Sequence, residues 1–589
     1  MTAKDSTTEE NKQHDGPTIN VDGIEYTAEE DMTVLEFLRG IDKEVPNLCY
    51  MDGVYESGAC RICLVENLES GELITSCNTP IEDGMKIETK NERVRQTRIM
   101  NLEFLLSNHE TDCPSCIKNK DCELRQITEE MGIRDVRFPG EQTDFTEDHS
   151  TPAIRRVPDK CINCRRCENI CSDTQTVNAL AAEGRGFDTL IGPSYFDELA
   201  KSPCVMCGQC VVACPTGAIT EKENIEDVWK AINDPEQRVI VQTAPAVRVA
   251  LAEEFEQPPG TVATGKMVTA LRRMGFDEVY DTNFAADLTI LEEGTEFIER
   301  LEGEGDLPLF TSCSPGWINF IETFYPQFLD NVSTCKSPQQ MFGAVANSYY
   351  QEKKNIDSDD LTVVSIMPCT AKKYEAQRPE MEGDVDYVLT TRELAQMIKQ
   401  MGIHLCNLPE DDYDLMLGSS TGAAAIFGTT GGVMEAALRT AYEFLTDEEL
   451  PGIDFEPARG LDTGIKEATV EVDGKEVNIA IAHGLSNARK ILDAIEEGKE
   501  YHFVEFMTCP GGCIGGGGQP ISREDKETTL QKRMEAIYKI DSEKELRKSH
   551  ENPQVQELYR EYLDEPGSEL AHELLHTGYT AKDKYSNGR

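Results

Sequence analysis

The 589-residue sequence lacks any apolar run that approaches the roughly 18 residues of a membrane-spanning helix. It is also poor in basic residues, because 57 Lys and Arg stand against 108 Asp and Glu, for a formal net charge of −51. This charge disfavours nucleic-acid binding, since phosphates would be repelled. An ordinary solvated surface and a saline cytoplasm, whose salt screens self-repulsion, both fit it. Residues 1–17 lack the apolar stretch of a signal peptide, so we expect a disordered tail on a cytoplasmic protein.

Cysteine, in contrast, is abundant, and most of the 21 cysteines fall into tight groups. In a secreted protein they would suggest disulfides. In a large chain without a signal peptide, metal ligation is the better interpretation. The length predicts about three to five domains.

The first cysteine group has the spacing C-x10-C-x2-C-x13-C and comprises Cys49, Cys60, Cys63 and Cys77. Four thiolates suit a [2Fe–2S] cluster, since soft iron prefers soft sulfur; a zinc site is the alternative. The flanks predict a hairpin over residues 18–27, around Asp22-Gly23, and a short helix over 33–40. These elements indicate a small mixed fold.

The second group contains one histidine and three cysteines: His109, Cys113, Cys116 and Cys122. It could ligate an iron–sulfur cluster, or zinc as a Cys3His site. Residues 93–107 are expected to form an amphipathic helix, which would place His109 just past a helix end.

The third and fourth groups repeat the spacing C-x2-C-x2-C-x3-C. In two-cluster ferredoxins, the fourth cysteine of each run ligates the other cluster. We therefore assign two [4Fe–4S] sites, one formed by Cys161, Cys164, Cys167 and Cys214 and one by Cys204, Cys207, Cys210 and Cys171. The 32 residues between Cys171 and Cys204 suggest an insertion. Four adjacent clusters indicate a relay for single electrons.

Three peptides in the second half place cysteine in loops rich in Pro and Gly: residues 311–317, 367–375 and 505–520. Such loops let the backbone approach a cluster closely. In this order the peptides resemble the catalytic domain of [FeFe]-hydrogenases. The preceding groups resemble the accessory domains of that family's large ferredoxin-linked members and of the cluster subunit of respiratory complex I. The resemblance runs from about residue 18 to the C-terminus.

The resemblance implies an H-cluster, in which a cysteine sulfur joins a [4Fe–4S] cubane to a two-iron unit carrying CO, cyanide and a bridging dithiolate. It implies that Cys369, Cys509 and Cys513 ligate the cubane and that Cys513 is the bridge. It also places Lys372 beside an iron-bound cyanide, to which an ammonium donates well. The residues implied to pack against the two-iron unit are Met367 and Met507.

The first peptide departs from the family pattern, which has Cys-Cys where this chain has Cys313-Ser314. In the family, the first cysteine relays protons and the second ligates the cubane. Serine is a harder ligand and should bind iron less well. Either Cys313 shifts to ligate the cubane, or it stays the relay and Ser314, or nothing, fills the fourth position; we favour the second interpretation.

The same resemblance implies a proton path from solvent to Cys313 through Glu293, Glu296, Arg300 and Ser333. The first three have helical spacing and can share one face. An ordinary solvated helix face is the alternative in so acidic a chain.

The fold expected is a multidomain α+β and α/β protein. We expect a β-grasp [2Fe–2S] domain at 18–97, a small helical His/Cys3 cluster domain at 98–150, a two-cluster ferredoxin domain at 151–222 and an α/β H-cluster domain at 223–589. In the last domain we predict strands at 238–242 and 361–366 and helices at 266–274 and 391–400. Cys335 and Cys406 match no ligand pattern and are expected to be packing residues.

The function expected is reversible oxidation of hydrogen, coupled to ferredoxin through one [2Fe–2S] cluster, three accessory [4Fe–4S] clusters and the H-cluster. An alternative is the catalytic subunit of an electron-bifurcating complex, whose flavin and NAD subunits would be other chains, since no dinucleotide fingerprint occurs here. A complex I-like electron-transfer subunit, or a hydrogenase-like protein of iron–sulfur assembly or sensing, are further alternatives. Maturation proteins would build the two-iron unit.

Overall fold

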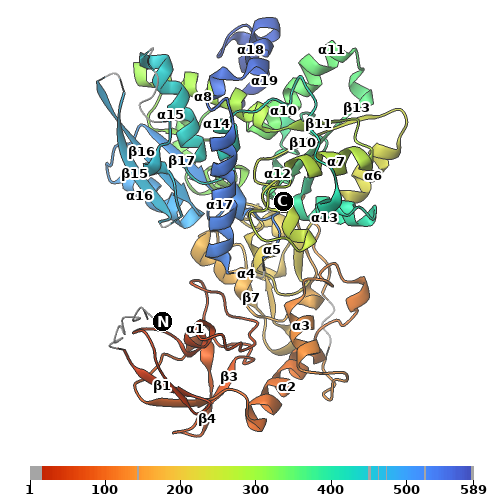
Figure 1. Ribbon diagram of the computed structural model, residues 1–589, viewed down its shortest axis with the longest axis vertical. Helices are drawn as coiled ribbons and strands as arrows, with labels where there is room; N and C mark the ends of the chain where they lie inside the picture. Colours follow the sequence, from red (N-terminus) through yellow and green to blue (C-terminus); the bar gives the residue numbers. More distant parts are fainter. Residues whose placement is uncertain are drawn as a thin grey trace, which may run out of the picture.

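The computed structural model describes residues 16–141, 145–446, 448, 453–461, 463–472, 474–522 and 525–584. The tail expected at residues 1–17 lies outside the described residues up to residue 15. The N-terminal segments, drawn in red and orange, form the lower end of the molecule, and the green and blue segments form the larger upper part (Figure 1). Within the described ranges, no helix is long and apolar enough to cross a membrane.

The N-terminal sheet has five strands in the order β2-β1-β5-β3-β4. β1 and β2 form the predicted hairpin, and β1 also pairs in parallel with β5. The predicted helix is α1, whose N-cap Thr33 makes a reciprocal capping box with Glu36. The bounds are β1 Thr18–Val21, β2 Ile24–Thr27, α1 Val34–Gly40, β3 Leu64–Asn67, β4 Glu72–Thr75 and β5 Met85–Glu88.

The helix predicted at 93–107 is α2 (Glu92–Ser107), but its buried side is not purely apolar. Arg98 and Glu103 are buried along with the apolar residues of the helix. Arg98 donates hydrogen bonds of 3.0 and 2.6 Å to the carbonyl oxygen of Leu64, which joins the helix to β3. The prediction of an amphipathic helix with an apolar buried side was therefore wrong in part. Charged side chains can be buried on this side because hydrogen bonds compensate them.

The ferredoxin-type segment begins with β6 and ends with β9. These two strands pair antiparallel. The spacer between the two ferredoxin-type runs folds into a second hairpin, β7 with β8, as an insertion would. The bounds are α3 Glu123–Glu130, β6 Ile154–Arg156, α4 Arg166–Asn169, β7 Ala181–Glu183, β8 Leu190–Gly192, α5 Gln209–Ala213 and β9 Ile219–Glu221.

The upper part contains two four-stranded sheets. One has the order β11-β10-β13-β14 with all neighbours parallel, and the other has the order β12-β17-β16-β15 with only β15 antiparallel. The predicted strands correspond to β10 and β13. The bounds are β10 Arg238–Thr243, β11 Glu278–Asp281, β12 Leu309–Phe310, β13 Leu361–Met367, β14 Tyr387–Thr390, β15 Ile465–Val472, β16 Lys475–His483 and β17 Phe503–Met507.

Helices surround both sheets, and α8 joins their cores (Figure 1). Phe284 and Leu288 of α8 belong to the apolar cluster of the first sheet, whereas Ile290 and Phe297 belong to that of the second. The predicted helices are α7 and α13. The bounds are α6 Ile225–Asn233, α7 Thr264–Met274, α8 Asn283–Glu302, α9 Pro315–Phe324, α10 Pro338–Val345, α11 Gln351–Lys354, α12 Ala371–Glu375, α13 Thr391–Gln400, α14 Gly422–Ile426, α15 Gly432–Thr446, α16 Leu485–Glu496, α17 Lys526–Glu543, α18 Pro553–Leu558 and α19 Glu569–Leu575.

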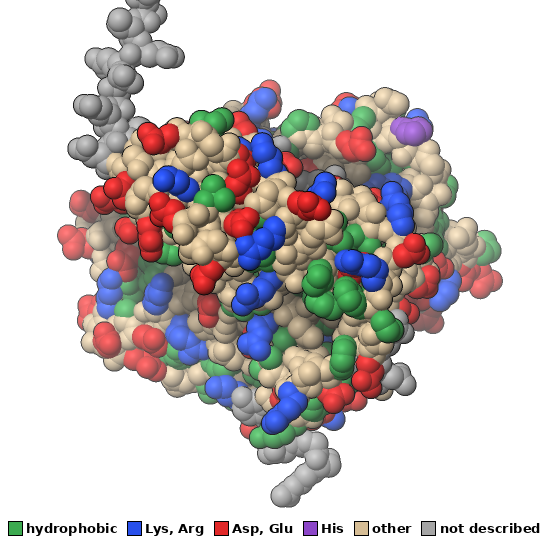
Figure 2. Space-filling view, turned by 90° about the horizontal axis from the view of Figure 1, so that it is seen from below, with side chains coloured by type: hydrophobic (Ala, Val, Ile, Leu, Met, Phe, Trp, Pro, Cys, Tyr) green, Lys and Arg blue, Asp and Glu red, His purple; other side chains and the backbone are tan. Residues whose placement is uncertain are grey.

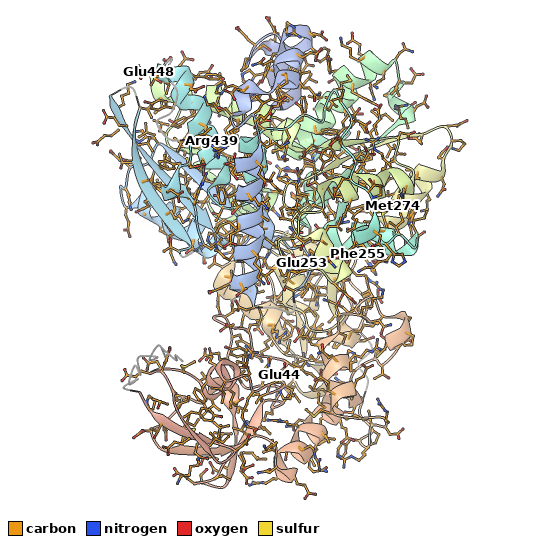
Figure 3. All side chains as sticks on the ribbon, viewed as in Figure 1. Glu44, Glu253, Phe255, Met274, Arg439 and Glu448 are labelled. Atoms are coloured by element: carbon orange, nitrogen blue, oxygen red, sulfur yellow. The ribbon has the colours of Figure 1, made fainter. Side chains whose placement is uncertain are left out.

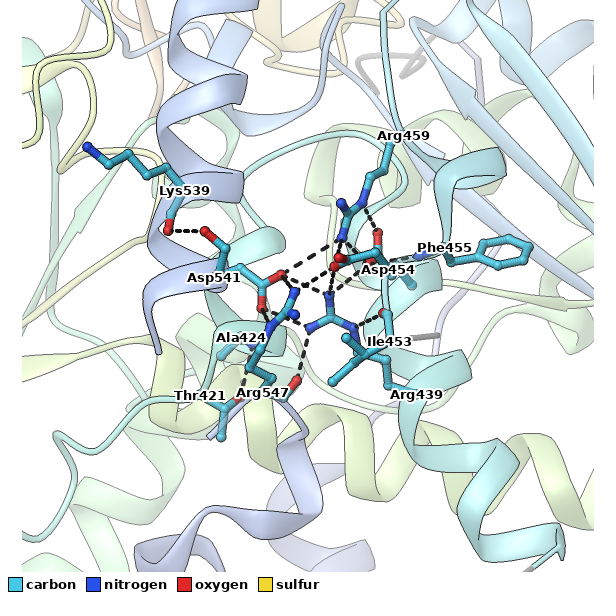
Figure 4. Close-up of polar contacts among 12 residues, drawn as sticks. Thr421, Ala424, Arg439, Ile453, Asp454, Phe455, Arg459, Lys539, Asp541 and Arg547 are labelled. Carbon is cyan, nitrogen blue, oxygen red and sulfur yellow. Dashed lines mark hydrogen bonds and ion pairs between the residues drawn. The ribbon is translucent and has the colours of Figure 1, made fainter. Parts of the chain in front are cut away.

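A buried ion network joins α15 to α17 (Figures 3 and 4). The fully buried Arg439 of α15 donates to both carboxylate oxygens of Asp541 on α17, each at 2.9 Å, and to Glu435 at 2.7 Å. Arg459 and Arg547 contact the same carboxylates from neighbouring loops. Arg439 is the fully buried cation that contacts both carboxylates, so its removal would leave Glu435 and Asp541 with only their less buried arginine partners.

The acidic excess of the chain is uneven on the face seen from the N-terminal end. Lys and Arg side chains gather towards the middle of this face, and Asp and Glu side chains lie more towards its margin (Figure 2). The net charge therefore does not describe the local surface that a partner would meet.

Candidate iron–sulfur and catalytic site

The first cysteine group converges beside the N-terminal sheet. The thiol of Cys49 contacts those of Cys60 and Cys77, and Cys77 in turn contacts Cys63. The backbone N–H of Cys60 also donates to Cys49 Sγ at 3.5 Å. All 21 cysteines lie within the described ranges and none forms a disulfide. Four free thiols in contact are the donor set of a metal cluster.

The second group supplies a neutral imidazole. His109 lies just past the end of α2, and its buried Nδ1 has no hydrogen-bond partner among the described residues. Burial, and then the charge of Lys160, lowers the pKa of His109 to about 4, so a lone pair is available at pH 7. Burial and then the charges of Cys116 and Cys113 raise the pKa of Cys122, since the three thiols are neighbours. This unpaired buried nitrogen fits a metal ligand.

Two cavities lie in the ferredoxin-type segment. One is lined by Cys161, Cys164, Cys167 and Cys214. The other is lined by Cys171, Cys204, Cys207 and Cys210. The last cysteine of each run therefore lines the cavity of the other run, and the structure brings together the two sets that the spacing predicts.

These four groups form a continuous row. One apolar cluster contains Cys49 and Cys60 of the first group, Cys122 of the second and Cys164 of the third. A second apolar cluster contains cysteines of both ferredoxin-type cavities, with Cys369 of the second half packed against it. These shared apolar clusters place neighbouring cysteine groups close together, as a row of electron carriers requires.

The three cysteine-containing peptides of the second half begin at the carboxyl ends of strands. Residues 311–317 follow β12, residues 367–375 begin at the last residue of β13, and residues 505–520 begin within β17. Each strand lies in a parallel pair at this end, and loops beyond the carboxyl ends of such strands commonly form ligand sites. The two sheets thus present their loops to one region.

Cys369, Cys509 and Cys513 meet in this region. Burial, and then the charges of Cys369 and Cys513, raise the pKa of the Cys509 thiol. Burial, and then the charge of Cys509, likewise raises that of Cys207, which lines the nearer ferredoxin-type cavity. The structure therefore brings three thiols together beside the inner end of the row.

Close backbone contact holds this junction. A Cβ atom at Gly517 would lie 2.2 Å from the carbonyl oxygen of Cys207, so a larger residue cannot be accommodated there. Gln209 donates to the carbonyl oxygen of Gly515 at 2.9 Å, and Thr370 donates to that of Met206 at 2.7 Å. The glycine run of the third peptide thus allows the ferredoxin-type segment to dock.

Cys313 and Ser314 point to different neighbours. Cys313 is partly buried, and desolvation followed by the charges of Glu293 and Cys513 raises the pKa of its thiol well above the usual value. Ser314 Oγ lies 2.8 Å from Thr508 Oγ1 and accepts from the Thr508 backbone N–H at 3.3 Å. The thiol therefore lies between the candidate proton path and the bridging position, whereas the serine hydroxyl contacts the residue before Cys509.

Lys372 is buried and held by a carboxylate. Its ammonium donates to Glu375 at 2.8 and 3.0 Å and to the carbonyl oxygen of Cys313 at 3.1 Å. Glu375 also accepts from Ser337 at 2.9 Å and from Gln339 at 3.1 Å. The ammonium is therefore fixed at the Cys313 backbone with its three donors engaged, and an anionic ligand bound there would take the place of one of these acceptors.

The candidate proton path lies on the inner face of α8. Ser333 Oγ donates to Glu296 Oε2 at 2.8 Å, and Arg300 donates to Glu296 Oε1 at 2.6 Å. Burial, and then the charge of Glu296, raises the pKa of Glu293 to about 8, although a hydrogen bond from Ser333 opposes this. Glu293 is 1% exposed, so the alternative of a solvated helix face is wrong for this residue.

Met367 and Met507 are both buried, at the carboxyl ends of β13 and β17. Among the residues treated as packing, Cys335 is buried as expected, whereas the packing prediction for Cys406 is wrong, because its side chain is exposed. The short helical turn at residues 405–407 places it on the surface.

Sequence reasoning missed two buried carboxylates. Glu375 stands three residues after Lys372, a helical spacing that could have indicated the ion pair. Glu505 accepts from the backbone N–H groups of Gly431 and Met434 at 2.6 and 2.8 Å, and burial raises its pKa to about 7. No local pattern predicts that second contact, since its partners lie more than 70 positions away in sequence.

Fold and site together define a multidomain iron–sulfur oxidoreductase in which a row of cysteine sites ends at a buried loop-built centre. Family models match along the chain. The C-terminal domain of the iron-only hydrogenase large subunit matches residues 237–517, and the iron hydrogenase small subunit matches 526–582. The 2Fe-2S iron–sulfur cluster binding domain matches 17–92, the NADH-ubiquinone oxidoreductase-G iron–sulfur binding region matches 98–137 and the 4Fe-4S dicluster domain matches 160–218.

The chain is 49% identical over 583 residues to the NADP-reducing hydrogenase subunit HndD of Solidesulfovibrio fructosivorans, covering 96% of this chain and 99% of that protein. It is 40% identical to iron hydrogenase 1 of Clostridium pasteurianum, covering 95% and 99%. An apo [FeFe]-hydrogenase structure from Chlamydomonas reinhardtii matches with a TM-score of 0.55 and 44% identity, covering 62% of this chain and all of that one. The chain belongs to the iron-only, or [FeFe], hydrogenase family. The resemblance found in the sequence is confirmed, and iron–sulfur clusters are favoured over zinc at the N-terminal groups.

Proposed function

We propose that this chain catalyses the reversible oxidation of molecular hydrogen to protons and electrons. The observation that carries the proposal is the meeting of Cys369, Cys509 and Cys513 beside Cys207, with the Lys372 ammonium fixed at the same place. The H-cluster, when bound, supplies the redox centre at which hydrogen is split or formed. The protein supplies its ligands, a dry enclosure and separate routes for electrons and protons.

The proposed ligands follow the groups described above. The proposed cofactors are one [2Fe–2S] cluster, three accessory [4Fe–4S] clusters, one of them ligated by His109, and the H-cluster. Cys369, Cys509 and Cys513 ligate its cubane, and Cys513 is the bridge. Met367 and Met507 pack against the two-iron unit. The domain boundaries proposed from the sequence, 18–97, 98–150, 151–222 and 223–589, separate these sites.

Cys313 is proposed to be the proton relay and not a cubane ligand. Its partly buried thiol lies near Glu293, while the Ser314 hydroxyl is engaged by Thr508. A proton leaving the centre would pass from Cys313 Sγ to the Glu293 carboxyl and through Ser333 Oγ to Glu296. Arg300 orients Glu296 by its ion pair.

Infrared spectroscopy of anaerobically matured protein tests the proposal. We expect bands from iron-bound CO and cyanide, together with hydrogen evolution from a reduced dye. Cys513→Ala should lose both, whereas Cys406→Ala, at an exposed cysteine outside every group, should keep both. Matured wild-type protein with neither signal would refute the proposed function.

The electron partner is proposed to be ferredoxin or a similar carrier, docking near the N-terminal clusters. The similarity to a subunit named as NADP-reducing favours a second candidate, in which this chain is the catalytic subunit of a larger complex with flavin and NAD(P) subunits. The purified chain alone should then reduce ferredoxin with hydrogen but not NADP. NADP reduction by the single chain would overturn both arrangements.

A further inference from the structure

A further group of side chains that could ligate a metal ion lies outside every cluster site described above. Glu296 of α8, Cys335 before α10 and His576 after α19 each offer one ligand atom, and these atoms all lie within 4.8 Å of one another. Cys335 and His576 are also paired through their backbones by an isolated β-bridge. Three distant segments of the chain thus converge on one point.

We propose that Glu296, Cys335 and His576 bind a Zn²⁺ ion. One thiolate, one imidazole and one carboxylate are the donor types that zinc takes in tetrahedral sites, and three protein ligands leave a fourth position for water or a hydroxyl. Thr334 Oγ1 adjoins the ligands, at 2.7 Å from His576 Nδ1 and 3.5 Å from Glu296 Oε2, and could hydrogen-bond a water in that position. An iron–sulfur cluster is not suited to this mixed set of only three ligands.

Groups behind the ligands already hold them in orientation. His576 Nε2 lies 3.1 Å from a carboxylate oxygen of the fully buried Glu292, whose other oxygen accepts from Tyr559 at 2.5 Å. A histidine that bonds a carboxylate through one nitrogen, and presents the other to a metal, is the usual arrangement at zinc sites. Nδ1 is the nitrogen that faces Thr334 and is therefore the expected ligand.

The two carboxylate oxygens of Glu296 also have different partners. Its Oε1 accepts from Arg300 at 2.6 Å, while Oε2 lies 3.9 Å from Cys335 Sγ. Oε2 can therefore approach a metal without loss of the ion pair. The Glu296 side chain is 12% exposed, which gives an ion access to a site whose cysteine is fully buried.

Local charge favours a divalent cation. Two glutamates of α8 contact the site directly, Glu296 as a ligand and Glu292 through its contact with His576 Nε2. Arg300 is the cation paired with this group in the contacts given above. Zinc would displace the thiol proton and offset this negative potential.

Occupation of the site would engage Glu296, the outer carboxylate of the proposed proton path, so this consequence rests on the proposed function. Zinc should then slow hydrogen turnover reversibly, and a chelator should restore it. The metal site itself is tested independently of turnover.

Zinc X-ray absorption of the holoenzyme, loaded with one equivalent of Zn²⁺ and washed free of excess, tests the site. We expect one sulfur at about 2.3 Å and nitrogen or oxygen ligands at about 2.0 Å. Three or four sulfurs per zinc, or loss of iron in proportion to zinc gained, would mean that zinc enters the cluster sites and would overturn the proposal.

Matched variants complete the test. Cys335→Ala should lose the sulfur signal and the retained zinc, whereas Cys406→Ala should retain one zinc with an unchanged spectrum. Glu292→Gln, which alters only the group behind His576, should weaken zinc binding about 10–100-fold. Equal zinc retention by Cys335→Ala and wild type refutes the site, whether or not the enzyme turns over hydrogen.

Discussion

Replacement of Glu293 by glutamine separates the proton-carrying role of this side chain from its shape. Glutamine has about the same size and shape as protonated glutamate, but it cannot release and take up the proton. We expect turnover to fall by about 10²–10⁴-fold, the usual contribution of a positioned proton carrier. The variant should keep its full iron content, because Glu293 is not a proposed ligand.

The same substitution should change stability in a pH-dependent way. Burial raises the pKa of Glu293 from 4.5 to about 8. Because the folded pKa exceeds the unfolded one, the stabilisation from the bound proton is complete below about pH 4.5 and is lost as pH rises through 8. The difference corresponds to at most roughly 5 kcal/mol. Glutamine escapes this loss, so the variant should match wild type near pH 5 and melt several degrees higher at pH 9.

Anaerobic calorimetry at pH 5, 7 and 9, with hydrogen evolution measured on the same samples, checks both effects. Glu299→Gln is the matched control, since this glutamate lies on the same helix with its side chain exposed. The control should follow wild type at every pH. Wild-type turnover in Glu293→Gln, or a melting temperature that tracks wild type at pH 9, would show that this carboxyl neither carries protons nor titrates as described.

Three further predictions concern ligands and packing. Ser314→Cys should supply a thiolate at the family's ligand position and shift the redox potential and electron paramagnetic resonance spectrum of the cubane, whereas an unchanged spectrum would show that the position does not face it. His109→Ala should remove one accessory cluster, seen as a loss of about four irons per chain while the other clusters' signals remain. Arg439→Met should destabilise the fold by about 3–5 kcal/mol, because Asp541 loses a buried partner; the exposed-site variant Lys539→Met should change the melting temperature little.

The metal-binding framework was predictable from the sequence because its signals are local. The cysteine run that ends at Cys171 can be recognised within eleven consecutive positions. The hairpin turn can be recognised from the dipeptide Asp22-Gly23 alone. The strands and helices predicted in the second half were confirmed for the same reason. Even the exchange of Cys171 and Cys214 between cavities follows from a general rule for such runs.

Features that depend on distant contacts were not predictable. The composition of α2 suggested an apolar face, but the carbonyl oxygen of Leu64 on another element makes burial of Arg98 possible. Glu505 and His576 act through partners that the chain brings together only after folding. Cys335 is the clearest example. A single cysteine outside any spaced group looks the same in the sequence whether it packs in a core or ligates a metal together with distant residues.

The two proposed routes from the catalytic centre place opposite demands on the protein and leave the centre through different segments. Electrons need closely spaced clusters, and the close backbone contact between Gly517 and Cys207 brings the two cysteine-rich segments together on one side. Protons need titratable groups that can stay neutral in a low-dielectric interior, because a fixed negative charge there would oppose reduction of the centre. The raised pKa values of Cys313 and Glu293 meet that demand on the other side. Burial thus serves both proposed routes, since it places the cysteine groups close together and raises the pKa values of the proposed proton carriers.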